Sequence, residues 1–144
     1  MKLEDKVALI TGASRGIGRA IDLKFSEEGE KTIINYNKSE KEAFDVFNII
    51  KDNGQESYLV QADISKYSEI KHMINKAIKV YGKINILVNN AGIIFRNSFF
   101  ESNESSWDNT MNTNLKSAYF CSQIAAEEML KQKKGVIINI ASNS

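Results

Sequence analysis

Thr11-Gly12-Ala13-Ser14-Arg15-Gly16-Ile17-Gly18 is the stretch that decides the fold. It follows the apolar run Val7–Ile10, and Ile17 begins a stripe with Ile21 and Phe25 at helical spacing. A glycine turn between a buried strand and a helix lets the backbone approach a ligand closely. It also aims unpaired N–H groups and the positive end of the helix dipole at one point. The sequence therefore predicts an anion site, suited to a pyrophosphate.

Short apolar runs alternate with longer segments of helical period, which predicts βαβ units on a parallel sheet. The runs that we interpret as strands are Val7–Ile10, Thr32–Tyr36, Tyr58–Gln61, Ile84–Val88 and Val136–Ile140. We expect an α/β fold with a doubly wound parallel sheet of strand order 3-2-1-4-5, in one domain spanning residues 1–144. A ligand crevice is then expected at the carboxyl ends of the first and fourth strands.

Helical period is expected over about 17–29, 39–53, 70–81 and 105–131. Ser39 and Glu42 have the spacing of a capping box at the second helix. Ser105 and Asp108 are candidate caps of the fourth. The fourth helix also carries an apolar stripe, consisting of Trp107, Met111, Leu115, Ala118 and Tyr119. Trp107, Tyr119 and Phe120 could form an apolar patch for a contact between subunits, although core packing is the commoner use of such residues.

The amino-acid composition argues against several classes of protein and of partner. The 144 residues are 42% hydrophobic and carry a formal net charge of +1, so no charge argument favours nucleic acid or an anionic membrane. The single cysteine, Cys121, excludes an internal disulfide, and the first residues do not resemble a signal peptide. No apolar run approaches the length of a membrane span. We expect a cytoplasmic protein without a nucleic-acid or membrane partner.

A second motif, Asn89-Asn90-Ala91-Gly92, follows the predicted fourth strand directly. Small residues there leave space beside a ligand, and the amides can brace the central strands. Together with Thr11–Gly18, this motif resembles the short-chain dehydrogenase/reductase family, whose members have a Rossmann sheet. The resemblance implies a dinucleotide cofactor held by Thr11, Gly12, Ser14, Arg15, Gly16, Ile17, Gly18, Asn90, Ala91 and Gly92.

The resemblance extends to four further positions. Asp63, followed by Ile64, matches the acidic residue that in this family hydrogen-bonds the adenine amino group. Asn114 matches the helix asparagine that holds a water in the proton relay, and Ser142 matches the catalytic serine that orients the substrate carbonyl. The structural alternatives are a helix-capping Asp63, an ordinary Asn114 on a helix face, and Ser144 in place of Ser142.

The family's catalytic tyrosine and lysine, in the pattern Tyr-x-x-x-Lys, should come on the next helix, and the sequence does not contain that helix. The one literal match, Tyr67 to Lys71, begins the helix after the third predicted strand. Four strand spacings separate it from Ser142 at the end of the fifth strand, so we expect Tyr67, Lys71 and His72 to be surface residues. The family's strands 6 and 7 are also missing, which would leave 136–140 as an open, apolar sheet edge. We therefore expect the chain to be part of a longer enzyme.

The end of the second predicted strand bears on cofactor choice. An NAD site places an acidic residue about twenty residues past the glycines, where this chain has Asn37 and Lys38. Arg15 and Lys38 could instead pair with a 2′-phosphate. We expect NADP rather than NAD.

These expectations favour an NADP-dependent oxidoreductase that acts on a carbonyl or secondary alcohol, most like the 3-oxoacyl-[acyl-carrier-protein] reductases of the family. On its own, this chain should bind cofactor without turnover. One alternative is a sugar or polyol dehydrogenase, which Ala91–Ile94 also resembles. Another is a catalytically inactive nucleotide-binding or interaction module. The resemblance also implies a homo-oligomer formed through the long fourth helix.

Overall fold

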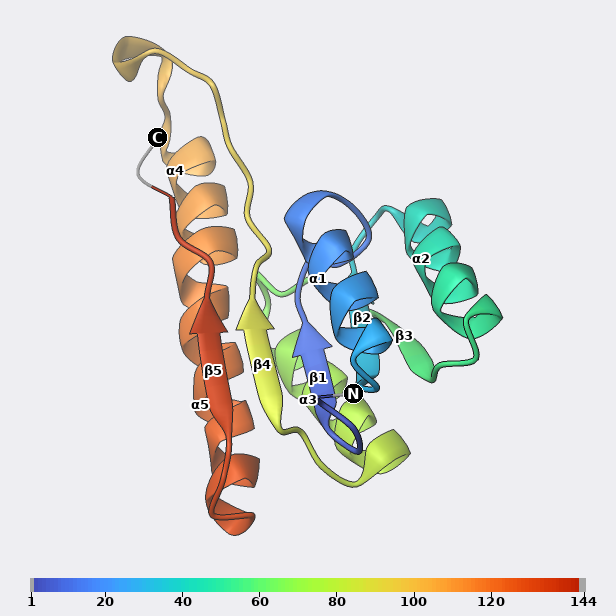
Figure 1. Ribbon diagram of the computed structural model, residues 1–144. Helices are drawn as coiled ribbons and strands as arrows, with labels where there is room; N and C mark the ends of the chain where they lie inside the picture. The colour runs from blue at the N-terminus through green and yellow to red at the C-terminus, as the bar shows by residue number, and fades with distance from the viewer. Residues whose placement is uncertain (1, 143–144) are drawn as a thin grey trace.

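Five parallel strands form one sheet, in the order β3-β2-β1-β4-β5 (Figure 1). The structure is a computed structural model that describes residues 2–142. The strands are β1 (Val7–Ile10), β2 (Lys31–Tyr36), β3 (Ser57–Gln61), β4 (Ile86–Asn89) and β5 (Val136–Asn139). All four neighbouring pairs are parallel, so the predicted fold class and strand order are confirmed.

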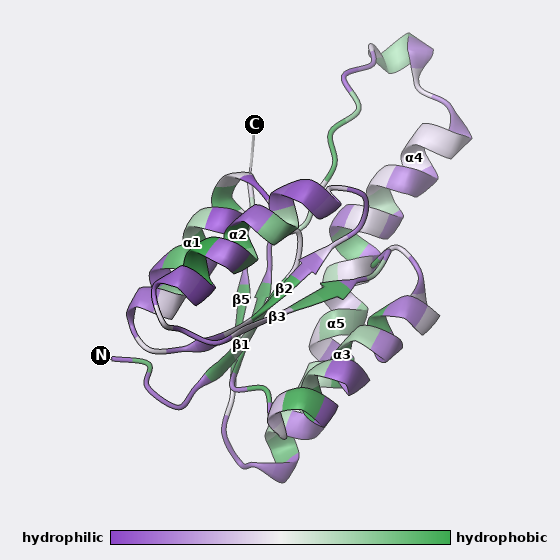
Figure 2. Ribbon diagram, turned by 90° about the vertical axis from the view of Figure 1, so that its right-hand side faces the viewer, coloured by the Kyte–Doolittle hydropathy of each residue, from purple (hydrophilic) through white to green (hydrophobic). Residues whose placement is uncertain are grey.

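Helices cover both faces of the sheet (Figure 2). The helical elements are α1 (Gly16–Glu27), α2 (Glu40–Asp52), α3 (Tyr67–Tyr81), the 3₁₀ turn η1 (Phe99–Glu101), α4 (Glu104–Met111), the π-helical turn η2 (Asn112–Lys116) and α5 (Ser117–Lys131). Helices α1 and α2 lie on one face, and α3 and α5 lie on the other. The chain therefore has the three-layer arrangement of a doubly wound sheet.

Each face of the sheet has its own apolar core, because successive side chains of a strand point to opposite faces. On β2, Ile33 packs with the α3 and α5 side, whereas Ile34 packs with the α1 and α2 side. The core beneath α5 includes Cys121, which has no exposed surface. Burial raises the pKa of its thiol to about 12. The continuous apolar runs of the central strands thus serve both layers.

Two predicted helix caps are wrong. Ser39 precedes α2, but its side chain makes no capping hydrogen bond, so Ser39 and Glu42 form no capping box. At α4 the capping residue is Asn103, whose side chain accepts a hydrogen bond from the backbone N–H of Ser106 at 2.9 Å. The Ser106 hydroxyl completes the box with the backbone N–H of Asn103. Asparagine is as good an N-cap as serine, and the predicted start at Ser105 is off by about one position.

The predicted long helix is interrupted by η2, and its predicted apolar stripe does not face the core. Trp107, Leu115 and Tyr119 are each more than half exposed, at 66%, 58% and 64%. The face that packs on the sheet carries Cys121 and Ala125 instead. Trp107 lies before η2, Leu115 lies within it and Tyr119 follows it, so the stripe forms an exposed face of the helix along its whole length. Within residues 2–142, no helix has the length and apolar character needed to cross a membrane.

Replacing Ile74 tests the core beneath α3 and α5. Ile74 has no exposed surface, so Ile74→Ala should lower the free energy of unfolding by about 2–5 kcal/mol, measured by urea denaturation. Val80→Ala, on the same helix but at a side chain that is 40% exposed, is the matched control and should cost less than about 1 kcal/mol. Equal losses for the two variants would contradict the described packing.

Candidate dinucleotide site

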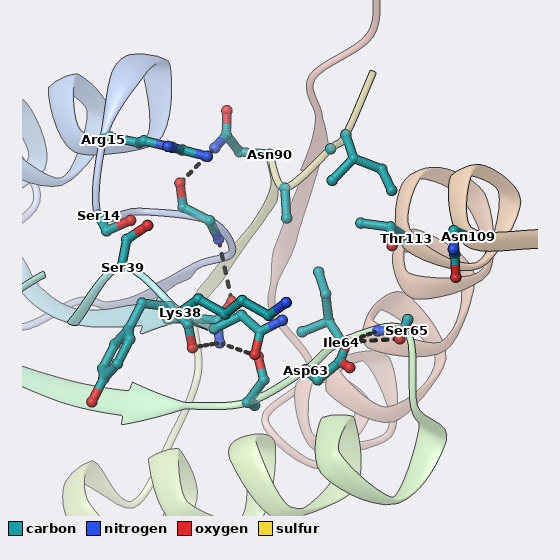
Figure 3. A pocket seen from close by; sticks show the side chains of 18 of the residues that line it. Ser14, Arg15, Lys38, Ser39, Asp63, Ile64, Ser65, Asn90, Asn109 and Thr113 are labelled. Carbon is teal, nitrogen blue, oxygen red and sulfur yellow. Dashed lines mark hydrogen bonds between the residues drawn. The ribbon is translucent and has the colours of Figure 1, made fainter. Parts of the chain in front are cut away.

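A cleft of about 600 Å³ lies at the carboxyl ends of β1, β2 and β4 (Figure 3). It is bounded by the turn after β1, the segment after β2, the segment after β3 and the segment after β4. Asn109 of α4 and Thr113 of η2 line it from the side of the long helix. This is the edge of the sheet where the strand order reverses, which is where open α/β sheets bind ligands.

Thr11 joins the turn after β1 to the segment after β4. Its side-chain oxygen accepts hydrogen bonds from the backbone N–H groups of Asn90 and Ala91, both at 3.0 Å. In return, the Asn90 side-chain amide donates to the carbonyl oxygens of Thr11 at 3.0 Å and Gly12 at 3.2 Å. Four hydrogen bonds therefore fix the two motifs against each other at the floor of the cleft.

Two glycines are needed for this close approach. A Cβ atom on Gly12, where φ is +61°, would lie 2.9 Å from the Cα of Ala91. A Cβ atom on Gly18 would lie 2.5 Å from both the Asn90 side-chain nitrogen and the carbonyl oxygen of Gly12. Real Cβ contacts are not this short, so only glycine fits either position. Gly16 differs, because its φ of +59° favours glycine although a Cβ atom there would meet nothing within 4 Å.

Asn35 braces the other side of the turn. This residue of β2 is buried, and its side-chain oxygen accepts a hydrogen bond from the backbone N–H of Gly12 at 3.2 Å. Its amide nitrogen donates to the carbonyl oxygens of Val60 and Ala62 at the end of β3. The prediction of site residues missed Asn35. A polar amide inside an otherwise apolar strand is the signal that could have identified it.

Asp63 forms the corner of the cleft beyond β3. Its carboxylate accepts hydrogen bonds from the backbone N–H and the hydroxyl of Ser65, at 3.1 and 2.6 Å (Figure 3). Partial burial raises the pKa of Asp63, but the Ser65 hydrogen bonds and then the Lys66 ammonium outweigh it, so the pKa lies below its ordinary value. The other carboxylate oxygen is 3.7 Å from Lys66. Asp63 thus organises the loop before α3 while remaining charged at the cleft wall.

Two exposed cations stand near the opposite end. Arg15, at the start of α1, and Lys38, after β2, both line the cleft, and Figure 3 shows Lys38 extending across it. Among residues 2–142, neither side chain takes part in an ion pair that would occupy its charge. Asn37, beside Lys38, is exposed and brings no negative charge.

Asn114 lies in the π-helical turn η2 and contacts the segment after β4. Its side-chain oxygen accepts from the backbone N–H of Ile93 at 2.8 Å, and its amide donates to the carbonyl oxygen of Ile93 at 2.8 Å. Single π-helical turns inside α-helices occur frequently at functional sites. Ser142 follows β5 at the same edge of the sheet, and Ser144 lies outside the described residues.

The structure gathers most of the predicted cofactor residues in one cleft. Those that line it are Gly12, Ser14, Arg15, Asn37, Lys38, Asp63, Ile64, Asn90, Ala91 and Gly92. The other predicted residues do not line the cleft. They are Thr11 and Gly18 beneath the turn, Gly16 and the exposed Ile17 at the start of α1, Asn114 and Ser142. Lining residues that sequence reasoning missed are Asn35, Tyr36, Ser39, Ala62, Ser65, Ile93, Phe95, Asn109 and Thr113. Most of these directly flank a predicted residue and carry no distinctive motif.

Comparison with known proteins gives a consistent match. The family model described as short chain dehydrogenase matches residues 6–144. A 3-oxoacyl-[acyl-carrier-protein] reductase FabG of Staphylococcus epidermidis is 44% identical over 138 residues, which is 96% of this chain and 57% of that protein. A short chain dehydrogenase from Burkholderia cenocepacia, solved in complex with NADP, is 32% identical with a TM-score of 0.93, over 99% of this chain and 57% of that one. The chain therefore spans little more than half the length of these relatives.

Substitution of the two glycines of the turn separates a close contact from backbone strain. Gly18→Ala should lower the free energy of unfolding by about 1–3 kcal/mol, because the new methyl group displaces the Asn90 amide. It should also shift the NMR resonances of that side-chain amide. Gly16→Ala is the matched control: it strains the backbone by about 1–2 kcal/mol and should leave the Asn90 amide resonances in place. Unshifted resonances in Gly18→Ala would contradict the described contact.

Proposed function

Because the chain belongs to the short chain dehydrogenase family, we propose that its cleft binds NADP(H) and that it forms the nucleotide-binding part of a carbonyl reductase. This proposal rests on the hydrogen bonds between Thr11 and Asn90, which fix the glycine turn at the carboxyl ends of β1 and β4. A turn held in this way presents the first N–H groups of α1, which have no partners within the helix, toward the cleft.

The donors around the cleft fit the parts of a dinucleotide. The turn of residues 12–18 offers backbone N–H groups and the positive end of the α1 dipole to the pyrophosphate. Asp63, ionised at the corner beyond β3, is a hydrogen-bond acceptor for the adenine amino group. Ala91 and Gly92 leave room for the nicotinamide end, because neither has a bulky side chain. When bound, the cofactor would supply or accept the hydride.

Charge favours NADP over NAD. The segment after β2 has no acidic residue at 37 or 38 to hydrogen-bond a ribose 2′-hydroxyl. Arg15 and Lys38 instead place two cations beside the cleft, where they can pair with a 2′-phosphate. The Burkholderia cenocepacia relative, whose structure contains NADP, supports this assignment.

Ser142 and Asn114 are the residues that this chain would supply to hydride transfer. In the proposed chemistry, the Ser142 hydroxyl donates a hydrogen bond to the substrate carbonyl and orients it, while Asn114 helps to hold the proton relay. The one Tyr-x-x-x-Lys pattern, from Tyr67 to Lys71, is on α3, where the Tyr67 ring packs edge-on against Phe120 at 5.1 Å. We propose that this pair takes no part in catalysis, and that these 144 residues alone bind cofactor without turnover.

The relatives support a proposal for the substrate class. The staphylococcal proteins of 43–44% identity are 3-oxoacyl-[acyl-carrier-protein] reductases, which favours a 3-oxoacyl thioester over a sugar or polyol as substrate. Assembly is proposed to use the long helix of α4 and α5. Trp107, Leu115 and Tyr119 expose apolar surface there, in keeping with a contact between subunits.

Charge removal at the cleft tests the cofactor assignment. The chain should bind NADPH more tightly than NADH, as measured by nucleotide fluorescence titration at fixed salt concentration. Lys38→Ala or Arg15→Ala should weaken NADPH binding roughly tenfold while leaving NADH binding unchanged, because each removes a charge-assisted contact with the 2′-phosphate.

Lys51→Ala is the matched control, since Lys51 is an exposed cation near the far end of α2 and does not line the cleft. It should leave both affinities unchanged. Tighter binding of NADH than of NADPH would refute the NADP assignment, and binding of neither nucleotide would refute the site itself.

A further inference from the structure

Buried side-chain oxygens of four polar residues lie between α1 and the neighbouring strands without hydrogen-bond partners. Seven buried side-chain oxygens lack a partner in the described part of the chain, and six of them belong to Asp22, Glu30, Thr32 and Ser57. Buried polar atoms are nearly always paired, so six unpaired atoms in one place need a physical explanation. None of these residues belongs to the dinucleotide cleft.

The backbone places these side chains on one face of the sheet. Thr32 and Ser57 are direct partners in the register of β2 and β3. Each lies two residues before a side chain of the α1 and α2 core, Ile34 and Leu59, so each points toward the same layer. Glu30 precedes β2 with the same alternation. Asp22 comes from α1, which covers this face (Figure 2).

Burial in this layer acts against ionisation. Asp22, Glu30 and Thr32 have no exposed surface. Burial, and then the nearby charge of Glu30, hold the pKa of Asp22 well above its ordinary value, and Thr32 offsets this only in part. Burial also raises the pKa of Glu30 to about 7 against the opposing charge of Lys6.

Lys6 and the two carboxyls themselves are the charged groups that act on the pair within residues 2–142. Lys6 comes from the segment before β1. Among residues 2–142, neither Asp22 nor Glu30 takes part in an ion pair.

The cluster has fewer hydrogen-bond donors than acceptors. With both carboxyls ionised, four carboxylate oxygens face only two donors, the hydroxyl hydrogens of Thr32 and Ser57. One added proton supplies a third donor and removes one of two like charges buried side by side. Two carboxyl groups that share a site typically retain one proton between them, because ionising both would place two like charges close together.

We propose that Asp22 and Glu30 hold one shared proton in the folded protein, which makes the packing of α1 on the start of β2 a pH-dependent device. The folded pair keeps its proton above the pH at which unfolded carboxyls lose theirs, about pH 4. The stabilisation is therefore complete below that pH and is lost as pH rises through the folded value. Between these limits, the equilibrium constant for unfolding should rise about tenfold per pH unit from this proton alone.

Urea denaturation at pH 5, 6 and 7 tests the proposal. The double variant Asp22→Asn/Glu30→Gln removes both buried carboxyls, so its unfolding constant should rise about tenfold less per pH unit than that of the unmodified chain. Asp22→Asn alone serves as a second variant, because the Glu30 carboxyl that remains is still buried and should keep the pH dependence. Asp45→Asn is the matched control, because Asp45 is exposed on α2 and should leave the pH dependence unchanged.

Two further measurements use the unmodified chain. Its infrared spectrum at pH 6 should contain the C=O stretching band of a protonated carboxyl group, and that band should be lost at high pH. Absence of the band, or equal pH slopes in the unmodified chain and in the double variant, would overturn the proposal. Stabilisation of the unmodified chain, but not of Asp22→Asn, by millimolar Mg²⁺ or Ca²⁺ would also overturn it and assign the cluster to a cation.

Discussion

The hydrogen bonds between Thr11 and Asn90 are the interaction on which the site depends. They join two segments that are nearly eighty positions apart in sequence and lie side by side only because β1 and β4 are neighbours in the sheet. The same contact explains why Gly12 and Gly18 carry no side chain. Loss of the contact would release the turn, and the N–H groups at the start of α1 would no longer converge on one point. The order of the strands in the sheet therefore determines the shape of the turn at the cleft.

The central strands and the site motifs could be predicted from sequence because their signals are local. A continuous apolar run predicts a strand buried on both faces, and a glycine turn after it predicts the start of a helix. The predicted strand order was also correct, since few orders are compatible with right-handed crossovers. The contribution of Asn35 could not be predicted, because its partners come from the turn after β1 and from β3, and they become neighbours only after folding.

The long helix shows where periodicity misleads. Its stripe from Trp107 to Tyr119 has the spacing of a core face, but it is exposed on both sides of η2, because the face that packs on the sheet carries Cys121 and Ala125 instead. Beside it, β5 is an edge strand whose side chains are mostly exposed, and a groove lined by Tyr119 and Ile137 lies between them. Apolar surface is therefore concentrated at one side of the sheet, whereas the other edge strand, β3, carries α2 against it. The asymmetry could not be seen in composition, which averages over both sides.

The burial of Cys121 gives the molecule an internal reporter. It is the chain's only thiol, it lies on the face of α5 that packs on the sheet, and its high pKa keeps it in the unreactive protonated form. A thiol reagent can reach it only when α5 separates from the sheet. The rate of alkylation therefore records how often this layer opens in the native state, with no label to introduce and no second cysteine to confuse the signal. Alkylation of this one sulfur atom thus makes the transient separation of α5 from the sheet measurable.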